Sequence, residues 1–425
     1  MAMHRIGSAL LLTAAIAAPA FAQAPRVATR SAVFAKDRLA RIDSALELSV
    51  RENRLVGGVL LVLRDGRPVY ERAFGQADRE SGRVMTPTSL FRIASQSKAF
   101  TSTAILMLVE EGKLSLGDPV GRYISTFTKT TVALKTDTGR AIVPAARAIT
   151  IRDLLTHTSG YSYGADSLVA PLYAAKDLGP VAGYGGWYTA DKDEATCTTM
   201  ERVGTLPAVA QPGAAWVYGY NTDILGCVVE RVSGMPLDQF VRTRITAPLG
   251  LADTKFFVDP ADRNRLATVY MSDAAGKAAR APDGARGQGH YVDGPRKNFA
   301  GGAGLVSTAR DYARFLEMIR RGGVLDGKRY LSPRTVDLMR TNQVGTRYRA
   351  ADGLGFGLAF EVTERVGAND YRSAGTFGWG GAYGSTYWVD PQEGLVVVWL
   401  VQMLPNNSQI GARIPALVYQ ALVAP

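Results

Sequence analysis

Two different hydrophobic periods follow each other near the start of the chain. Apolar residues recur every three or four positions between residues 39 and 50, which predicts an amphipathic helix over 36–53 with one buried stripe. Two short apolar runs, 57–64 and 68–74, come next and flank Asp65-Gly66. Because Asp-Gly is a preferred sequence for a two-residue turn, this region predicts a tight antiparallel hairpin.

The strand pattern returns near the other end of the chain. Apolar runs at 356–363, 384–389 and 395–401 predict three further strands. A final apolar segment, from about residue 410 to 422, predicts a closing helix.

The middle of the chain, by contrast, is richer in helical patterns and in long loops with Gly and Pro. We therefore expect an α/β (α+β) fold with an antiparallel sheet flanked by helices and built from both chain ends, residues 36–113 and 340–425. A mainly helical domain, residues 114–339, would be inserted between them. Two domains that meet along a seam also favour a cleft there.

The first 22 residues have the pattern of a secretory signal. A mildly basic start precedes an apolar run over 6–18 and the small-x-small sequence Ala20-Phe21-Ala22, so cleavage is predicted after Ala22. Residues 23–35 would then form a leader. No other stretch reaches the roughly 18 uninterrupted apolar residues of a membrane helix. We expect a soluble periplasmic or secreted protein with no membrane span.

Composition says little about the function of the protein, but it limits the kinds of partner that we expect. The chain is 47% hydrophobic and 20% charged, as in ordinary globular proteins, and its formal charge of +11 is scattered. No basic patch with interleaved aromatic residues occurs, so a nucleic-acid partner is not expected. Nothing in the pattern indicates an oligomeric state.

Only two cysteines, Cys197 and Cys227, are present. Export would permit one bridge between them. Cys227, however, falls three residues after Ile224 on a predicted helix, where a small buried thiol is more common than a bridge partner. The expectation is two free thiols.

Several classes of site are excluded by the residues themselves. After the predicted cleavage only His157 and His290 remain, and the sequence has no metal-binding His-Glu-x-x-His, paired Cys-x-x-Cys or phosphate-loop motif. We expect no metal and no cofactor. One serine motif, Gly160-Tyr161-Ser162-Tyr163-Gly164, matches a nucleophile elbow, which requires a strand before the serine. The segment 151–156 looks helical instead, so we interpret this match as accidental.

Ser95-Gln96-Ser97-Lys98 is the better candidate for a nucleophile. It precedes a largely apolar run, 99–109, so Ser95 is expected in the first turn of a helix. Residues three apart share a helical face, which lets the Lys98 ammonium reach the Ser95 hydroxyl. The start of a helix also offers free N–H groups and a positive dipole to an oxyanion. The spacing alone is weak, since a helix cap followed by a solvated lysine would look the same.

Two later segments strengthen the candidate. Trp216-Val217-Tyr218 leads into a predicted helix that begins near Thr222-Asp223. Trp379-Gly380-Gly381-Ala382 precedes a predicted strand. Each alone would be read as a core aromatic residue or a turn.

In this order, the segments resemble the family VIII carboxylesterases, which share the fold of class C β-lactamases and penicillin-binding D,D-peptidases. Residues 152–160 and 301–308 also match the family in style. The resemblance extends from about residue 39 to residue 401.

The resemblance implies roles for particular residues. Ser95 would attack the carbonyl and form an acyl-enzyme, while Lys98 and Tyr218 share the proton transfers. The N–H groups of Ser95 and Ala382 would form an oxyanion hole. The substrate-binding residues implied are Trp379, Gly380, Gly381 and Tyr220.

The second motif departs from the lactamase pattern, which has Asn two residues after the catalytic Tyr. Here Tyr220 stands there, and Asn221 follows one place later. A register that makes Tyr220 catalytic would lose the spacing to Trp216 and Asp223. Tyr218 is therefore favoured, with Tyr220 as the alternative.

The third motif bears on the substrate. Lactamases and D,D-peptidases carry a Lys there that binds a carboxylate, whereas this chain has Trp379. A neutral, short-chain carboxylic ester therefore suits the site better. Two alternatives stay open: a β-lactamase or D,D-peptidase of the same fold, in which an Arg from elsewhere replaces the lysine, and a non-catalytic envelope-binding protein.

Overall fold

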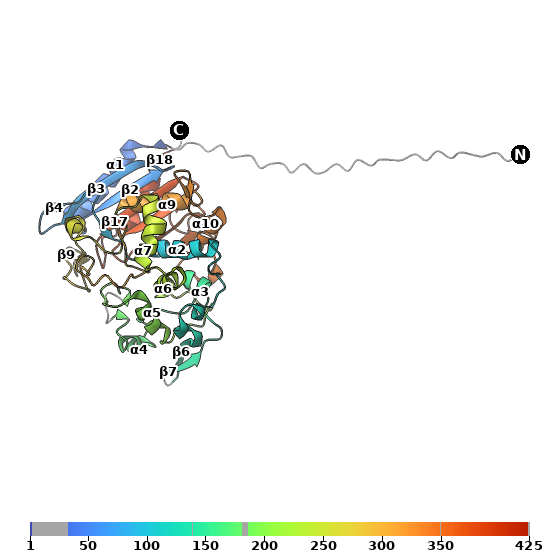
Figure 1. Cartoon of the computed structure of the whole chain (residues 1–425). Coiled ribbons are helices and arrows are strands. Elements are labelled where there is room, and N and C mark those ends of the chain that lie inside the picture. The colour runs from blue at the N-terminus through green and yellow to red at the C-terminus, as the bar shows by residue number, and fades with distance from the viewer. Residues whose placement is uncertain (2–32, 138, 181–185, 349, 424–425) are drawn as a thin grey trace.

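The computed structural model describes Met1 and residues 33–137, 139–180, 186–348 and 350–423. Its largest sheet has eight strands, all antiparallel to their neighbours, in the order β13-β14-β15-β16-β17-β2-β3-β4. The strands are β2 (Gly57–Arg64), β3 (Arg67–Asp78), β4 (Arg83–Val84), β13 (Leu354–Phe356), β14 (Glu361–Thr363), β15 (Phe377–Gly380), β16 (Thr386–Asp390) and β17 (Leu395–Val401). The sheet is thus built from both chain ends, as predicted, and Figure 1 shows these blue and orange-red strands together.

The centre of the sheet joins the two chain ends directly. Strand β17 pairs with β2 along its whole length, from Leu395 opposite Arg64 to Val401 opposite Gly58. The predicted β2–β3 hairpin is present, and its turn residues Asp65 and Gly66 both have positive φ, at 49° and 78°. A two-residue type I′ turn requires this conformation at both positions.

One predicted strand is in fact a hairpin. The apolar run 356–363 covers the end of β13, a turn and all of β14. The Gly357 N–H donates to the Phe360 carbonyl at 2.8 Å, which closes the turn. Because Leu358 and Phe360 in the turn are also fully buried, the run stays apolar throughout, and periodicity could not mark the reversal.

Both faces of the sheet are covered, so β17 is apolar at every position and β2 has no polar side chain before Arg64. Even-numbered residues of β2, such as Leu60, pack with α1 (Lys36–Arg51) and α11 (Ile410–Tyr419) in one core cluster. Odd-numbered residues belong to a second cluster that includes α9 (Ala309–Arg320). Helix α9 therefore packs on the sheet, although its residues lie within the range predicted for the helical domain.

The inserted region contains helices α3 (Ile151–Leu155), α4 (Ala170–Ala174), α5 (Thr196–Gly204), α6 (Asn221–Ser233), α7 (Leu237–Val241), α8 (Ala247–Leu249) and, near its end, α10 (Pro333–Met339). Its small strands are β6 (Thr131–Thr136), β7 (Gly139–Pro144), β8 (Tyr270–Ser272), β9 (Ala278–Arg280), β10 (Val306–Ser307), β11 (Val324–Leu325) and β12 (Lys328–Arg329). Figure 1 shows α5 and the β6–β7 hairpin on the side of α2 away from the sheet.

Helix α2 (Lys98–Glu110) lies between the sheet and the inserted helices. Residues 98–108 are all buried, and the helix contacts α6 and α7. Residues 99–109 include no charged side chain, as expected for a helix that is buried on every face. The residue that begins α2 is thus fixed between the two parts of the molecule.

The expectation of two free thiols is wrong, because Cys197 and Cys227 form a disulfide. Both residues are buried, as a thiol on a helix would be, but α5 packs against α6 and brings their Cα atoms to 4.9 Å. Proximity between two helices cannot be read from the environment of one of them.

Removal of this disulfide should destabilise the protein. A Cys197→Ala/Cys227→Ala double variant is expected to lose about 2–4 kcal/mol of unfolding free energy, because the bridge closes a segment of 30 residues. Urea unfolding monitored by circular dichroism measures the difference. A reductant should lower the midpoint of the wild type toward that of the variant, and equal stability of the two proteins would contradict the prediction.

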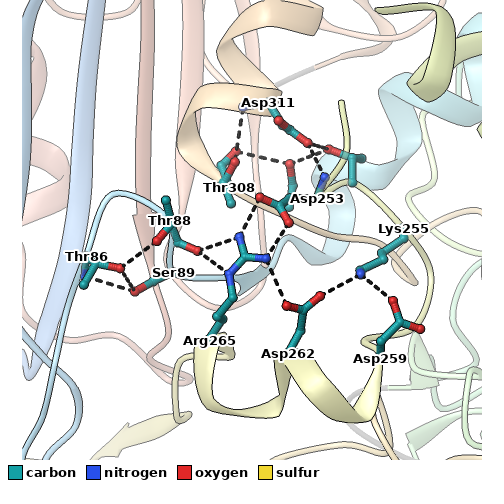
Figure 2. Close-up of polar contacts among 12 residues, drawn as sticks. Thr86, Thr88, Ser89, Asp253, Lys255, Asp259, Asp262, Arg265, Thr308 and Asp311 are labelled. Carbon is teal, nitrogen blue, oxygen red and sulfur yellow. Dashed lines mark hydrogen bonds and ion pairs between the residues drawn. The ribbon is translucent and has the colours of Figure 1, made fainter. Parts of the chain in front are cut away.

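A polar network braces the loop that leads to the candidate nucleophile. Figure 2 shows the Arg265 guanidinium donating to both Asp253 carboxylate oxygens, at 2.8 and 2.6 Å, and to the Thr88 carbonyl. The Asp253 N–H in turn donates to Asp311, in the first turn of α9. The segment before β5 (Phe91–Arg92) is thereby tied to α9.

Apart from Met1, the predicted signal peptide lies outside the described residues, and so does most of the predicted leader. The last residues of the leader range are part of the fold, because β1 (Val33–Phe34) pairs with β18 (Leu422–Val423). Among the described residues, no helix is long and apolar enough to cross a membrane.

Candidate active site

Ser95 lies in a single 3₁₀ turn, η1 (Ala94–Ser97), that runs directly into α2. The preceding residue, Ala94, has a φ of 44°, which is uncommon for a residue with a side chain. The third motif comes close to this turn. A Cβ atom at Gly381 would lie 2.6 Å from the Ile93 carbonyl oxygen, so only glycine allows this approach.

The Lys98 ammonium is buried and held by three acceptors. Its Nζ donates to Ser95 Oγ at 3.3 Å, to the Tyr163 hydroxyl at 3.1 Å and to the Gly302 carbonyl at 2.8 Å. The side chain is 4% exposed. Since an ammonium has three N–H donors, these bonds account for all of them and aim one at the Ser95 hydroxyl.

Tyr218 connects the second motif to the third. The Trp379 Nε1–H donates to the Tyr218 hydroxyl at 3.1 Å, and the Lys98 Nζ lies 4.6 Å from the centre of the Tyr218 ring. The His157 ring packs on the same phenol, with ring centres 4.8 Å apart. The structure therefore brings Ser95, Lys98, Tyr218 and Trp379 together.

These residues open onto a cleft of about 580 Å³. Ser95, Tyr218, Gly380, Gly381 and Ala382 all line it. The Ala382 N–H donates to no acceptor in the described part of the chain. It is therefore available to an oxygen bound in the cleft. The further lining residues are Tyr163, Trp187, Tyr348, Glu361, Arg372, Gly378, Trp379, Thr386 and Tyr387.

Tyr220 does not line this cleft, contrary to the substrate contact that the resemblance implied. It is fully buried, its hydroxyl donates to the Gly186 carbonyl at 2.5 Å, and it accepts from the Gly179 N–H at 3.1 Å. The Tyr220 hydroxyl is thus both a donor and an acceptor to backbone groups. The next residue, Asn221, donates to His157 Nδ1 at 3.0 Å and also points into the core.

The accidental elbow has none of the geometry of a nucleophile elbow. Ser162 follows helix α3 and a loop, and its Oγ accepts from the Gly164 N–H at 3.1 Å in a local turn. Its neighbour Tyr163, however, reaches Lys98. Sequence reasoning set this segment aside as a whole and so missed a tyrosine in contact with the candidate base.

Known proteins match the whole fold and not only these motifs. The family model described as "Beta-lactamase" matches residues 38–420. Protein Rv1367c of Mycobacterium tuberculosis is 36% identical over 85% of this chain and 90% of its own length. Esterase EstB of Burkholderia gladioli is 33% identical over 88% of this chain and 92% of its own.

The chain belongs to the beta-lactamase family.

Within that family the protein is a serine hydrolase, and its relatives place it with the family VIII carboxylesterases, as the motifs predicted. The solved structure of EstCE1, described as a hydrolase with promiscuous acyltransferase activity, superposes with a TM-score of 0.76 at 30% identity. The match covers 90% of this chain and 99% of that one. The predicted fold class is confirmed.

The charge balance of this beta-lactamase-family site includes a buried carboxylate. Asp223 is fully buried in the first turn of α6, and one of its oxygens accepts from the Gly302 N–H at 2.9 Å. The other oxygen has no hydrogen-bond partner among the described residues. Burial raises the Asp223 pKa to about 6, against the opposing effect of the Lys98 charge.

Asp223 should make stability depend on pH. The Asp223 pKa in the folded chain is above the usual 3.8, so the folded chain binds this proton more tightly than the unfolded chain does. The contribution of Asp223 to the free energy of unfolding therefore falls as the pH rises from about 4 to 6. Asp223→Asn removes this contribution. Relative to wild type, the variant should gain up to about 3 kcal/mol between pH 4 and pH 7. Urea unfolding at four pH values tests this, and a constant difference would contradict it.

His157 is an uncharged part of the site. Burial, together with the nearby Lys98 charge, lowers the pKa of His157 well below its usual value of 6.5. The ring therefore carries no charge at neutral pH. It supports Tyr218 by packing and binds Asn221 rather than serving as a base for Ser95.

Proposed function

We propose that this protein is a serine carboxylesterase that hydrolyses short-chain carboxylic esters through an acyl-enzyme on Ser95. The observation that carries the proposal is the Lys98 Nζ, which is buried, held by two other acceptors and 3.3 Å from Ser95 Oγ. The cleft beside it is open to a small molecule. A non-catalytic binding protein would not need this arrangement.

In the proposed reaction, the Lys98–Tyr218 pair reacts in the form that has lost one proton, because a Lys98 ammonium has no lone pair to accept another. Ser95 Oγ attacks the ester carbonyl as its own proton passes to this pair. The carbonyl oxygen becomes an oxyanion that the N–H groups of Ser95 and Ala382 stabilise, each donor contributing roughly 2.7–4 kcal/mol by analogy with other hydrolases. The carbon–oxygen bond to the alcohol then breaks, and the alcohol leaves with the proton. Water attacks the acyl-enzyme in the same manner and regenerates Ser95.

A short, neutral acyl group fits the cleft around Ser95. The third motif contributes the indole of Trp379 and no charge, and Trp187 and Tyr387 line the same space. The relative named Esterase EstB supports the ester class of substrate.

A weaker activity toward carboxylate-bearing β-lactams or D-alanyl peptides is favoured by one observation. Arg372 lines the cleft, and its Nε has no hydrogen bond within the described part of the chain. The Asp370 carboxylate lies 3.8 Å from this Nε. This guanidinium supplies a cation from outside the third motif.

The test compares p-nitrophenyl acetate and butyrate with nitrocefin on the purified protein. Ester turnover should exceed lactam turnover, and a fluorophosphonate probe should label the peptide that contains Ser95. Lactam turnover above ester turnover would make the protein a β-lactamase or peptidase. No labelling and no turnover would favour the binding protein.

A further inference from the structure

The Ser95 cleft has a second, larger arm. A cavity of about 1070 Å³ begins at Tyr218, Tyr348 and Trp379, which also line the cleft at Ser95. It continues away from the serine along Ala214, Ala215, Trp216, Thr346, Arg347 and Ala350. A short acyl chain would leave this space unused, so the arm needs another occupant.

Aromatic rings form the walls of this arm. Trp216 and Tyr218 are stacked, with ring centres 5.6 Å apart and planes at 12°. Tyr348 and Trp379 meet the Trp216 ring edge-on, at 4.8 and 6.2 Å. Rings that hold one another in this way present flat, fixed surfaces, which suit a planar apolar group.

A guanidinium without a carboxylate partner among the described residues lines this arm and takes no part in the cleft at Ser95. The Arg347 Nε donates to the Gly213 carbonyl at 2.6 Å and its Nη1 to the Val344 carbonyl at 3.0 Å. No carboxylate in the described part of the chain pairs with it. The two carbonyl contacts orient the group and leave its charge uncompensated.

The arm of the cleft at Ser95 carries charges of both signs. Glu361 lines the arm at Ser95, where its carboxylate accepts from the Tyr348 hydroxyl and from Asn369. Arg372 lines this arm too, so charges of both signs offset each other there, and an anionic group is favoured most near Arg347.

The proton transfer decides which half of an ester would enter this arm. The leaving alcohol must take its proton from the Lys98–Tyr218 pair, so it lies on the Tyr218 side of Ser95. The second arm starts at Tyr218.

We infer that the Tyr218–Arg347 arm binds the alcohol half of the substrate, and that this alcohol is a large planar aromatic group with a negative charge at its outer end. The inference rests on the proposed esterase function and adds the substrate class to it.

Three esters with a naphthol as the alcohol test the inference: 2-naphthyl acetate, 6-carboxy-2-naphthyl acetate and mono-2-naphthyl succinate. The second carries a carboxylate on the alcohol, and the third carries one on the acyl group. The carboxylate on the naphthol should raise kcat/KM by about fivefold, as expected for one partly exposed charge contact. The carboxylate on the acyl side should bring a smaller gain, because Glu361 and Arg372 line that arm together. The preference should weaken in high salt.

Variants separate this contact from general effects of charge. Arg347→Gln should remove the preference for the charged naphthol, whereas Arg347→Lys keeps part of it. Arg334→Gln is the matched control for net charge, because Arg334 is 92% exposed on α10 and lines no part of the cleft. This variant should keep the full preference.

The outcomes distinguish the two proposals. If 2-naphthyl acetate is hydrolysed but the carboxylate brings no gain, or if Arg347→Gln keeps the gain, the inference about the arm is wrong and the esterase proposal stands. If none of the three esters is hydrolysed, the esterase proposal fails and the inference fails with it.

Discussion

Ser95→Ala should abolish ester hydrolysis, lowering kcat by on the order of 10⁴-fold or more, because no acyl-enzyme can form without the hydroxyl. Ser162→Ala should keep most of the wild-type activity. Among the described residues, the Ser162 hydroxyl bonds only to the local Gly164 N–H, and Ser162 lies outside the cleft. Turnover of p-nitrophenyl butyrate measures both variants.

The two serines make a matched pair, since each variant loses one hydroxyl. Thermal melting should show both variants folded. An inactive Ser162→Ala variant together with an active Ser95→Ala variant would identify an elbow-type hydrolase. That result would refute the assignment of Ser95 as the nucleophile.

Lys98→Gln should lower kcat roughly 10³-fold or more, because the amide can accept no proton from Ser95 while it keeps donors for the Gly302 carbonyl. Single-turnover kinetics should place the loss in acylation. A normal acylation rate in this variant would exclude Lys98 as the base.

Two tyrosine variants give a finer test of the same pair. Tyr218→Phe should cost far more activity than Tyr163→Phe, because Tyr218 also lies at the branch where the alcohol leaves. Tyr163 contributes one hydrogen bond to Lys98, and its loss should cost no more than about tenfold. The reverse order would transfer the catalytic role to Tyr163, whose pKa burial holds well above its usual value near 10.

Local patterns predicted those parts of the molecule that local chemistry determines. The Asp65-Gly66 hairpin, the strand 395–401 and the helical start at Ser95 all follow from turn preference and periodicity. The order of the site motifs supplied the family resemblance, and the resemblance supplied the roles of the site residues. Turn residues buried as deeply as their strands hid the reversal between β13 and β14.

Contacts between distant segments could not be read in the same way. The disulfide depends on how α5 meets α6, and Tyr163 reaches Lys98 from a loop 65 residues away. The prediction placed Tyr220 at the substrate because it stands beside the second motif in the sequence. Its side chain points into the core instead. Arg347 carries no motif at all, and only the folded cleft places it beside Trp216.

The pairing of β17 with β2 also governs when the chain can fold. Strand β2 has its partner β3 at once, but its other edge stays open until residues 395–401 have emerged from the ribosome. Such long-range pairing is slow, and an open apolar strand edge attracts other chains. A nascent chain stopped after Asp390 would therefore leave the backbone edge of β2 unpaired from Gly58 to Arg64. It should be captured by chaperones or aggregate, and folding must wait until synthesis is almost finished.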